Sequence, residues 1–218
     1  VNDEPAGTTN TVETYVDGLV PGKRNSVRFV CGERELSVGV TTPAEPFTIN
    51  VRDCGAKGDA KHDDTTNIQA AIMACPKGGR VLIPAGNYRI KSLFLKSHIN
   101  IELAEGAVLL ARHDRAALAY IPGTVKGDEG AGYAGTDMTP LGRWEGESFA
   151  TYCSTFTGLS VHDVCIYGRG AIDGQTDFAE DNWWNKDFKN IFRPEEGREV
   201  ARPRMIFLSE CENVSLAG

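Results

Sequence analysis

The sequence predicts an all-β protein: a right-handed parallel β-helix with one capping α-helix, preceded by a partial β-sandwich. Three observations predict this fold. A single short amphipathic helix near residues 64–75 is followed by strand patterns with no second helix. The strand rhythm is interrupted twice and resumes each time, and two similar segments lie 50 residues apart. Strands without crossover helices cannot form βαβ units, so coiling them in successive rungs is the simplest arrangement.

Residues 1–43 are expected to form part of a β-sandwich. Short β patterns at 15–16, 26–30 and 36–40 are separated by glycines and charged residues. Together with the segment Gly18-Leu19-Val20-Pro21-Gly22, they resemble the C-terminal half of a fibronectin type III domain. Asn25 stands where that family places its corner tyrosine. Half a sandwich cannot bury its inner face, so the sequence predicts further strands before Val1.

Residues 44–218 are expected to form the N-terminal part of the β-helix, with 44–46 as a linker. The apolar positions of the capping helix, spaced i, i+3, i+4 and i+7, are Ile68, Ala71, Ile72 and Cys75. Either Asp64 or Thr66 could cap the first turn, and Thr66 with Gln69 has the spacing of a capping box. Pro76 and the glycines after it end the helix.

Beyond the helix the pattern is that of strands. Val81-Leu82-Ile83 is interpreted as a short buried strand. The alternating apolar positions that follow are Leu93, Leu95, Ile99, Ile101, Leu103, Val108 and Leu110. The rhythm is absent over residues 111–150 and 175–201, which are expected to be loops between rungs. Residues 163–168 and 213–218 align at an offset of 50, which we interpret as two rungs of about 25 residues each.

Composition limits the classes of partner. The net charge of −7 makes nucleic-acid binding unfavourable, whereas an anionic polysaccharide needs only a local basic groove. No apolar run is long enough to span a bilayer, so no membrane partner is expected. The six cysteines include no Cys-x-x-Cys pair, which argues against a zinc site. Four aspartates, Asp53, Asp59, Asp63 and Asp64, are assigned to turns and caps, and we predict no metal and no cofactor.

Two ordered sets of motifs resemble known families. Gly58-Asp59, Asp63-Asp64-Thr65, the helix 68–75 and the segment 78–88 resemble the N-terminal cap of pectin-lyase-like β-helix proteins. Arg143-Trp144-Glu145-Gly146, the segment 168–175, Trp183-Trp184, Arg202-Pro203 and the segment 211–214 follow in order. This second set resembles glycoside hydrolase family 28, the polygalacturonases.

The resemblance implies a glycosidase that cleaves the α-1,4-galacturonan of pectin with inversion. The fibronectin-like segment and the long loop favour exo action. Of the family's four catalytic motifs, Asn-Thr-Asp and Gly-His-Gly are absent from these 218 residues. The Asp-Asp and Arg-Ile-Lys strings occur only as Asp63-Asp64 in the helix cap and Arg89-Ile90-Lys91 in the first rung, whereas the family carries them on later rungs. No catalytic residue is therefore assigned, and the chain is expected to be an inactive N-terminal fragment whose catalytic residues lie beyond Gly218.

The candidate substrate-binding residues are Trp183, Trp184, Arg198, Arg202, Arg143 and Glu145. Aromatic faces can stack on a sugar ring, and guanidinium groups can bind its carboxylate through two hydrogen bonds. The alternative for the tryptophans is packing against the coil, and for Arg143 with Glu145 it is a buried ion pair. The histidines have no spacing that indicates catalysis. Asn213 is expected in a side-chain ladder inside the coil.

Two alternatives to a hydrolase remain at this point. One is a calcium-dependent pectate lyase, which cleaves by elimination, and the other is a β-helix that binds polysaccharide without cleaving it. In each case pectin or an oligogalacturonide is the expected partner. The expected location is extracellular or periplasmic, with the cytoplasm as the alternative.

Overall fold

The structure is a computed structural model in which the chain forms two compact units, Val1–Pro46 and Phe47–Gly218. The described residues are 1–11, 14, 16, 18–112, 117–121, 123–126, 138–140, 143–144, 147–148, 151–176, 192–193, 198–199 and 203–218. The one described helix is only ten residues long, and the described part of the chain has no helix with the length and hydropathy of a membrane span.

The first unit contains an antiparallel hairpin of β1 (Arg24–Cys31) and β2 (Arg34–Thr41). Asn25 is 1% exposed, and its side-chain oxygen accepts a hydrogen bond from the Val20 amide at 2.8 Å. Its side-chain nitrogen donates to the Val20 and Lys23 carbonyls. Asn25 thus fixes the chain that enters the hairpin by polar bonds. The fibronectin type III assignment of this unit stays a prediction.

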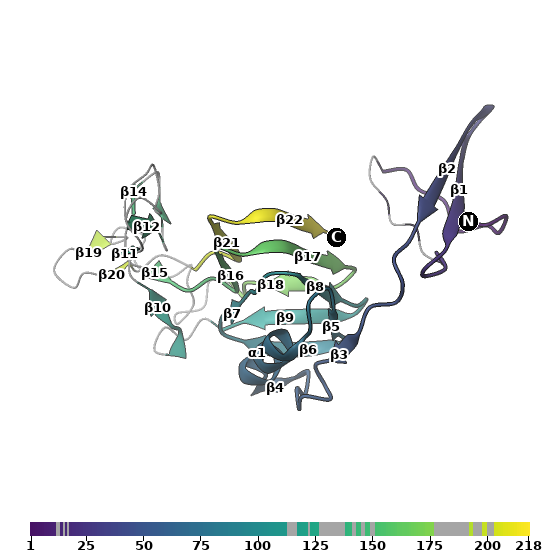
Figure 1. Cartoon of the computed structure of the whole chain (residues 1–218). Coiled ribbons are helices and arrows are strands. Elements are labelled where there is room, and N and C mark those ends of the chain that lie inside the picture. Colours follow the sequence, from purple (N-terminus) through teal and green to yellow (C-terminus); the bar gives the residue numbers. More distant parts are fainter. Residues whose placement is uncertain are drawn as a thin grey trace. The chain divides into compact units, whose positions relative to one another are not determined.

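The second unit is a coil of three parallel sheets, stacked rung upon rung in Figure 1. Sheet 1 contains, in spatial order, β22 (Glu212–Ala217), β17 (His162–Gly168), β8 (Ile99–Leu103), β5 (Arg80–Ile83) and β3 (Thr48–Asn50). Sheet 2 contains β18 (Ala171–Asp173), β9 (Ala107–Ala111), β6 (Gly86–Ile90) and β4 (Asp59–Asp63). Sheet 3 contains β21 (Ile206–Ser209), β16 (Phe156–Leu159) and β7 (Leu93–Phe94).

Short antiparallel pairs occur within the two long segments that connect strands of the coil, residues 112–155 and 174–205. They are β10 (Tyr120–Ile121) with β15 (Thr151–Tyr152), β11 (Thr124–Lys126) with β12 (Met138–Pro140), β13 (Arg143–Trp144) with β14 (Glu147–Ser148), and β19 (Phe192–Arg193) with β20 (Arg198–Glu199).

Helix α1 (Thr65–Ala74) buries the predicted face, because Ile68, Ala71, Ile72 and the adjoining Cys75 are all fully buried. The predicted capping box is wrong. The side-chain amide of Gln69 accepts a hydrogen bond from the Phe94 amide at 2.7 Å and donates to the Phe94 carbonyl at 2.9 Å. The Gln69 side chain therefore pairs the backbone N–H and C=O of Phe94, which a neighbouring strand would otherwise have to pair because β7 is at the edge of sheet 3.

The prediction of which strand residues face the core is correct through Leu103 and wrong for the next strand. In β9 the buried residues are Ala107, Leu109 and Ala111, whereas Val108 and Leu110 are only half-buried. The alternation simply continues from Leu103, and two small alanines take the inward positions. Apolar size misled the prediction, because the larger Val108 and Leu110 face outward.

The offset of 50 residues corresponds to one rung and not to two. Val164 pairs directly with Val214 and Ile166 with Leu216 in neighbouring strands. Where no long loop intervenes the repeat is much shorter, since Val81 pairs with Ile101. The additional length is the segment 174–205 between β18 and β21.

Candidate functional site

Both long segments that leave the coil do so at the same corner, between sheets 2 and 3. Residues 91–92 join β6 to β7 directly, but on the next rung residues 112–155 separate β9 from β16. On the rung after that, residues 174–205 separate β18 from β21. Because these strands are stacked neighbours, the two excursions start side by side and return side by side. We call this place the excursion corner; the short strands near it are visible in Figure 1.

The return points of the excursions are fixed by hydrogen bonds between rungs. The Leu93 amide donates to the Thr155 carbonyl at 2.8 Å, and the Thr155 amide donates to the Arg204 carbonyl at 3.1 Å. The buried Ser92 hydroxyl donates to the Cys153 carbonyl at 3.0 Å. The coil thus holds the base of each excursion in register with its neighbour, which is how a rigid scaffold positions loops that carry function.

Charged side chains gather where the strands of sheet 2 end at this corner. Asp63, at the end of β4, lies 3.2 Å from the Lys91 ammonium and 3.0 Å from the Arg112 guanidinium. Thr65 donates its hydroxyl proton to the other Asp63 oxygen and accepts a hydrogen bond from the Lys91 amide. Two cations share one carboxylate, so this group of three charges is net positive and suits an anionic ligand.

The Asp63 carboxylate is strongly held in its ionised form. Partial burial by itself would raise its pKa, but the two hydrogen bonds from Thr65 and the ion pair with Lys91 outweigh that effect and lower the pKa of Asp63 to about 2. The carboxylate is therefore charged at every physiological pH, and it keeps Lys91 and Arg112 in place beside the excursions.

The structure does not describe the side chains of any of the six predicted substrate-binding residues. Trp183, Trp184, Arg202 and Glu145 lie outside the described residues. Arg143 lies in β13 and Arg198 in β20, and for both only the backbone is described. Strand β20 contacts β15, which brings the strand of Arg198 against the first excursion. The six substrate-binding assignments stay predictions.

Sequence reasoning missed Lys91 and Arg112. Lys91 directly follows Ile90, the last residue of β6, and Arg112 directly follows Ala111, the last residue of β9. Ile90 and Ala111 are register partners in neighbouring strands. A search for cations at equivalent rung positions would have found them. That search needs to know which residues of neighbouring strands are paired. The pattern of apolar residues placed the inward-facing positions of β9 one residue away from their true positions.

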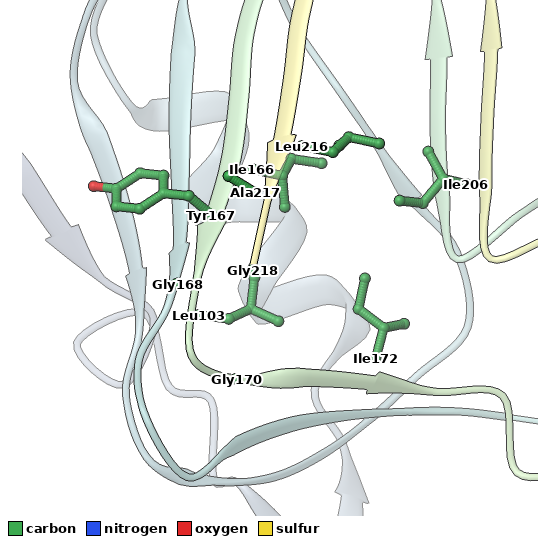
Figure 2. Close-up of a pocket in the computed structure, with 10 residues that line it drawn as sticks. All are labelled: Leu103, Ile166, Tyr167, Gly168, Gly170, Ile172, Ile206, Leu216, Ala217 and Gly218. Carbon is green, nitrogen blue, oxygen red and sulfur yellow. The ribbon is translucent and has the colours of Figure 1, made fainter. Parts of the chain in front are cut away.

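An apolar cavity of about 300 Å³ lies inside the coil at its last described rungs. Figure 2 shows Ile166, Ile172, Ile206 and Leu216 around this space, with the ring of Tyr167 directed away from it. No charged residue lines it. An apolar space between stacked strands is suited to packing and unsuited to a carboxylated sugar, which needs hydrogen-bond partners.

Comparisons with known proteins agree with this architecture. Residues 48–104 match the family model described as rhamnogalacturonase A/epimerase, pectate lyase-like. The chain is 39% identical over 107 residues to the exo-poly-alpha-D-galacturonosidase of Dickeya chrysanthemi, covering 49% of this chain and 16% of that protein. The family 28 exopolygalacturonase of Yersinia enterocolitica superposes with a TM-score of 0.58 at 24% identity, covering 84% of this chain and 36% of that one.

The second unit has the parallel β-helix fold of these proteins, and its sequence resembles the pectin-lyase-like, family 28 type. The matched residues 48–104 of this pectin-lyase-like coil include α1 and the first complete rung. The predicted fold class and family resemblance are therefore confirmed. The chain is also 46% identical over 70 residues to plasmin and fibronectin-binding protein A of Streptococcus pneumoniae, covering 30% of this chain and 10% of that protein.

The chain spans about a sixth of the Dickeya protein and about a third of the Yersinia chain. The activities stated in the names of those proteins are attributed to this chain only as a proposal.

Proposed function

We propose that this chain supplies the first rungs of a secreted or periplasmic enzyme that hydrolyses α-1,4-galacturonan with inversion. The observation that carries this proposal is the excursion corner. Two long segments emerge there on adjacent rungs, beside the net positive group of Asp63, Lys91 and Arg112. A galacturonan chain carries one carboxylate per sugar, so a cationic wall beside a groove would bind it and a neutral polysaccharide would gain nothing.

Exo action is the finer part of the proposal. Residues 112–155 and 174–205 are long enough to close one end of a groove that runs along the coil, so that only a chain end enters. The names of the Dickeya relative and the Yersinia structure, both exo-acting, support this reading. Endo action would need a groove open at both ends.

We further propose that these 218 residues do not hydrolyse substrate by themselves. An inverting glycosidase needs two carboxyl groups about 6.5–9.5 Å apart, one to protonate the leaving oxygen and one to activate water. The Asn-Thr-Asp and Gly-His-Gly motifs of polygalacturonases are absent from the sequence, and its one Asp-Asp pair, Asp63-Asp64, lies at the start of α1. The 218-residue chain should show no release of reducing ends, whereas the full-length protein should show it.

The test is the release of reducing ends from polygalacturonate by the full-length protein, in the presence of EDTA. Hydrolysis should continue without calcium and should give no unsaturated product.

Lys91→Ala and Arg112→Ala should raise KM more than they lower kcat, because they remove substrate binding and not the chemistry. Lys77→Ala, an exposed cation beyond the end of α1, is the matched control and should leave KM unchanged.

Two other results would replace the hydrolase proposal. An absorbance increase from unsaturated sugars that EDTA abolishes would identify a calcium-dependent lyase. Binding of oligogalacturonide with neither product would identify a non-catalytic binder, an outcome that the match to plasmin and fibronectin-binding protein A makes worth measuring.

A further inference from the structure

A different corner of the coil, before the strands of sheet 1, places similar residues above one another on three rungs. His98, Asp163 and Asn213 each directly precede residues that pair in neighbouring strands, namely Ile99, Val164 and Val214. All three adopt the left-handed conformation, with φ of 59°, 56° and 51°. His, Asp and Asn are among the non-glycine residues that adopt it most readily, so the turn itself explains these three residue types.

The turn conformation does not explain the side chain of His162. His162 precedes Asp163 and does not adopt a positive φ, yet its ring lies against that of His98, with ring centroids 4.4 Å apart in an edge-to-face arrangement. Both imidazoles direct Nδ1 at the same Asp163 oxygen, Oδ2, each at 3.0 Å. These three ligand atoms all lie within 4.8 Å of one another.

Asn213 orients the carboxylate from the other side. Its side-chain nitrogen donates to Asp163 Oδ1 at 2.5 Å, which leaves Oδ2 facing the two imidazoles. Asn213 is exposed, and so the expectation that it forms a ladder inside the coil is wrong; its ladder is on the outside.

We propose that His98, His162 and Asp163 bind a zinc ion. Zn²⁺ in proteins takes nitrogen and carboxylate ligands at about 2.0–2.2 Å in tetrahedral geometry, which places ligand atoms about 3.3 Å apart. The two separations of 3.0 Å need to widen only slightly to reach that value. Water completes the coordination. Each imidazole binds through the Nδ1 lone pair, so the proton that faces Asp163 leaves Nδ1 and the neutral ring keeps its proton on Nε2.

The backbone already holds the ligands near their binding positions. The His98 amide donates to the His162 carbonyl at 2.9 Å, and the Gly78 amide donates to the His98 carbonyl at 2.7 Å. The His162 amide donates to the Ser97 hydroxyl at 3.1 Å. Asn213 is a positioning residue of the kind that holds the non-ligating carboxylate oxygen at metal sites. A bound ion would therefore join the rungs of β8 and β17, and the hydrogen bond from Asn213 to Asp163 would link the rung of β22 to them. This inference does not depend on the proposed hydrolase activity.

The test uses the 218-residue chain with ¹⁵N-labelled histidine, titrated with ZnCl₂ and followed by NMR of the imidazole nitrogens. We expect one equivalent of Zn²⁺ to shift the Nδ1 resonances of His98 and His162. His62 is an internal control, because it pairs with Asp59 at 2.7 Å without a second imidazole. Its Nδ1 resonance should not shift at the same zinc concentration.

Variants separate this site from the six free cysteines, which also bind zinc when deprotonated. His162→Ala and Asp163→Asn should each weaken zinc binding at the histidines at least tenfold, whereas His62→Ala should not change it. Asn213→Gly, which retains the left-handed turn, should weaken it about tenfold through loss of positioning. Far-UV circular dichroism of each variant checks that the coil is intact.

Zinc should also raise the melting temperature of the wild-type chain and not that of His162→Ala, because an ion that binds only the folded state stabilises it. The proposal is wrong if zinc leaves the His98 and His162 resonances unchanged. It is equally wrong if the affinity measured at these resonances is the same in wild type and His162→Ala, since binding then needs no second imidazole.

Discussion

Replacing Asp64 with asparagine separates two roles that this residue could have. Asp64 occupies the N-cap of α1, yet its side chain makes no capping hydrogen bond. Its two carboxylate oxygens instead accept hydrogen bonds from the Lys57 amide at 2.6 Å and the Gly58 amide at 2.9 Å. Asp64 is 1% exposed, so water cannot replace either bond. Its role is to hold the turn before β4, where Gly58 adopts a φ of 59° against the ring of Tyr88.

The two roles predict different energies. Asparagine is as good as aspartate at an N-cap, so a capping role predicts a change of a few tenths of a kcal/mol or less. In the turn-holding role asparagine can accept only one of the two bonds, and its NH₂ group opposes the second amide donor. Hydrogen bonds to a charged group contribute about 1.5–3 kcal/mol each, so Asp64→Asn should lower the free energy of unfolding by about 3 kcal/mol.

Urea unfolding followed by far-UV circular dichroism measures this difference. With an m-value of about 2 kcal/mol/M, the midpoint should fall by about 1.5 M urea. Asp53→Asn, at an exposed position in the turn before β4, is the control and should stay within about 0.5 kcal/mol of wild type. A loss for Asp64→Asn of less than about 0.5 kcal/mol would refute the turn-holding role.

Three further predictions concern single residues. Gln69→Ala removes both hydrogen bonds to the edge of β7 and should cost about 1–2 kcal/mol in urea unfolding, and an unchanged midpoint would contradict the edge role. Gly168→Ala would place a Cβ atom 2.1 Å from the Leu103 carbonyl oxygen and should prevent accumulation of folded protein, whereas Gly174→Ala meets nothing within 4 Å and should be neutral. Since the pKa of Asp63 is lowered from 3.8 to about 2, its stabilising effect is complete above about pH 4 and is lost as the pH falls toward 2; Asp63→Asn should abolish that part of the acid dependence of stability.

The fold was predictable because its strongest signals are local. Ile68 and Ile72 define a helical face by spacing alone, and Ile99 and Ile101 define a strand that is buried on one side. The capping-box prediction was wrong because the deciding contact is distant in the sequence. Gln69 bonds with Phe94, a residue 25 positions away, and no spacing rule within the helix indicates that partner.

The candidate site was less predictable for the same reason. Asp63 and Arg112 form an ion pair only because the rungs bring sheet 2 strand ends together, and they are 49 residues apart. His98 and Asp163 meet across 65 residues of chain, of which 112–155 is the first excursion. Spacing along the chain showed no relation between these histidines and any carboxylate, and only the register of β8 with β17 reveals it.

The common exit of both excursions has a consequence for how such a protein can diversify. The free-energy cost of closing a flexible loop depends only weakly on its length, and doubling the number of residues adds about 0.6 kcal/mol to it. Residues 112–155 and 174–205 can therefore be lengthened, shortened or exchanged while Leu93, Thr155 and Arg204 keep the rungs in register. New ligand specificities can arise at this corner by insertion, without any change in the residues that stabilise the coil.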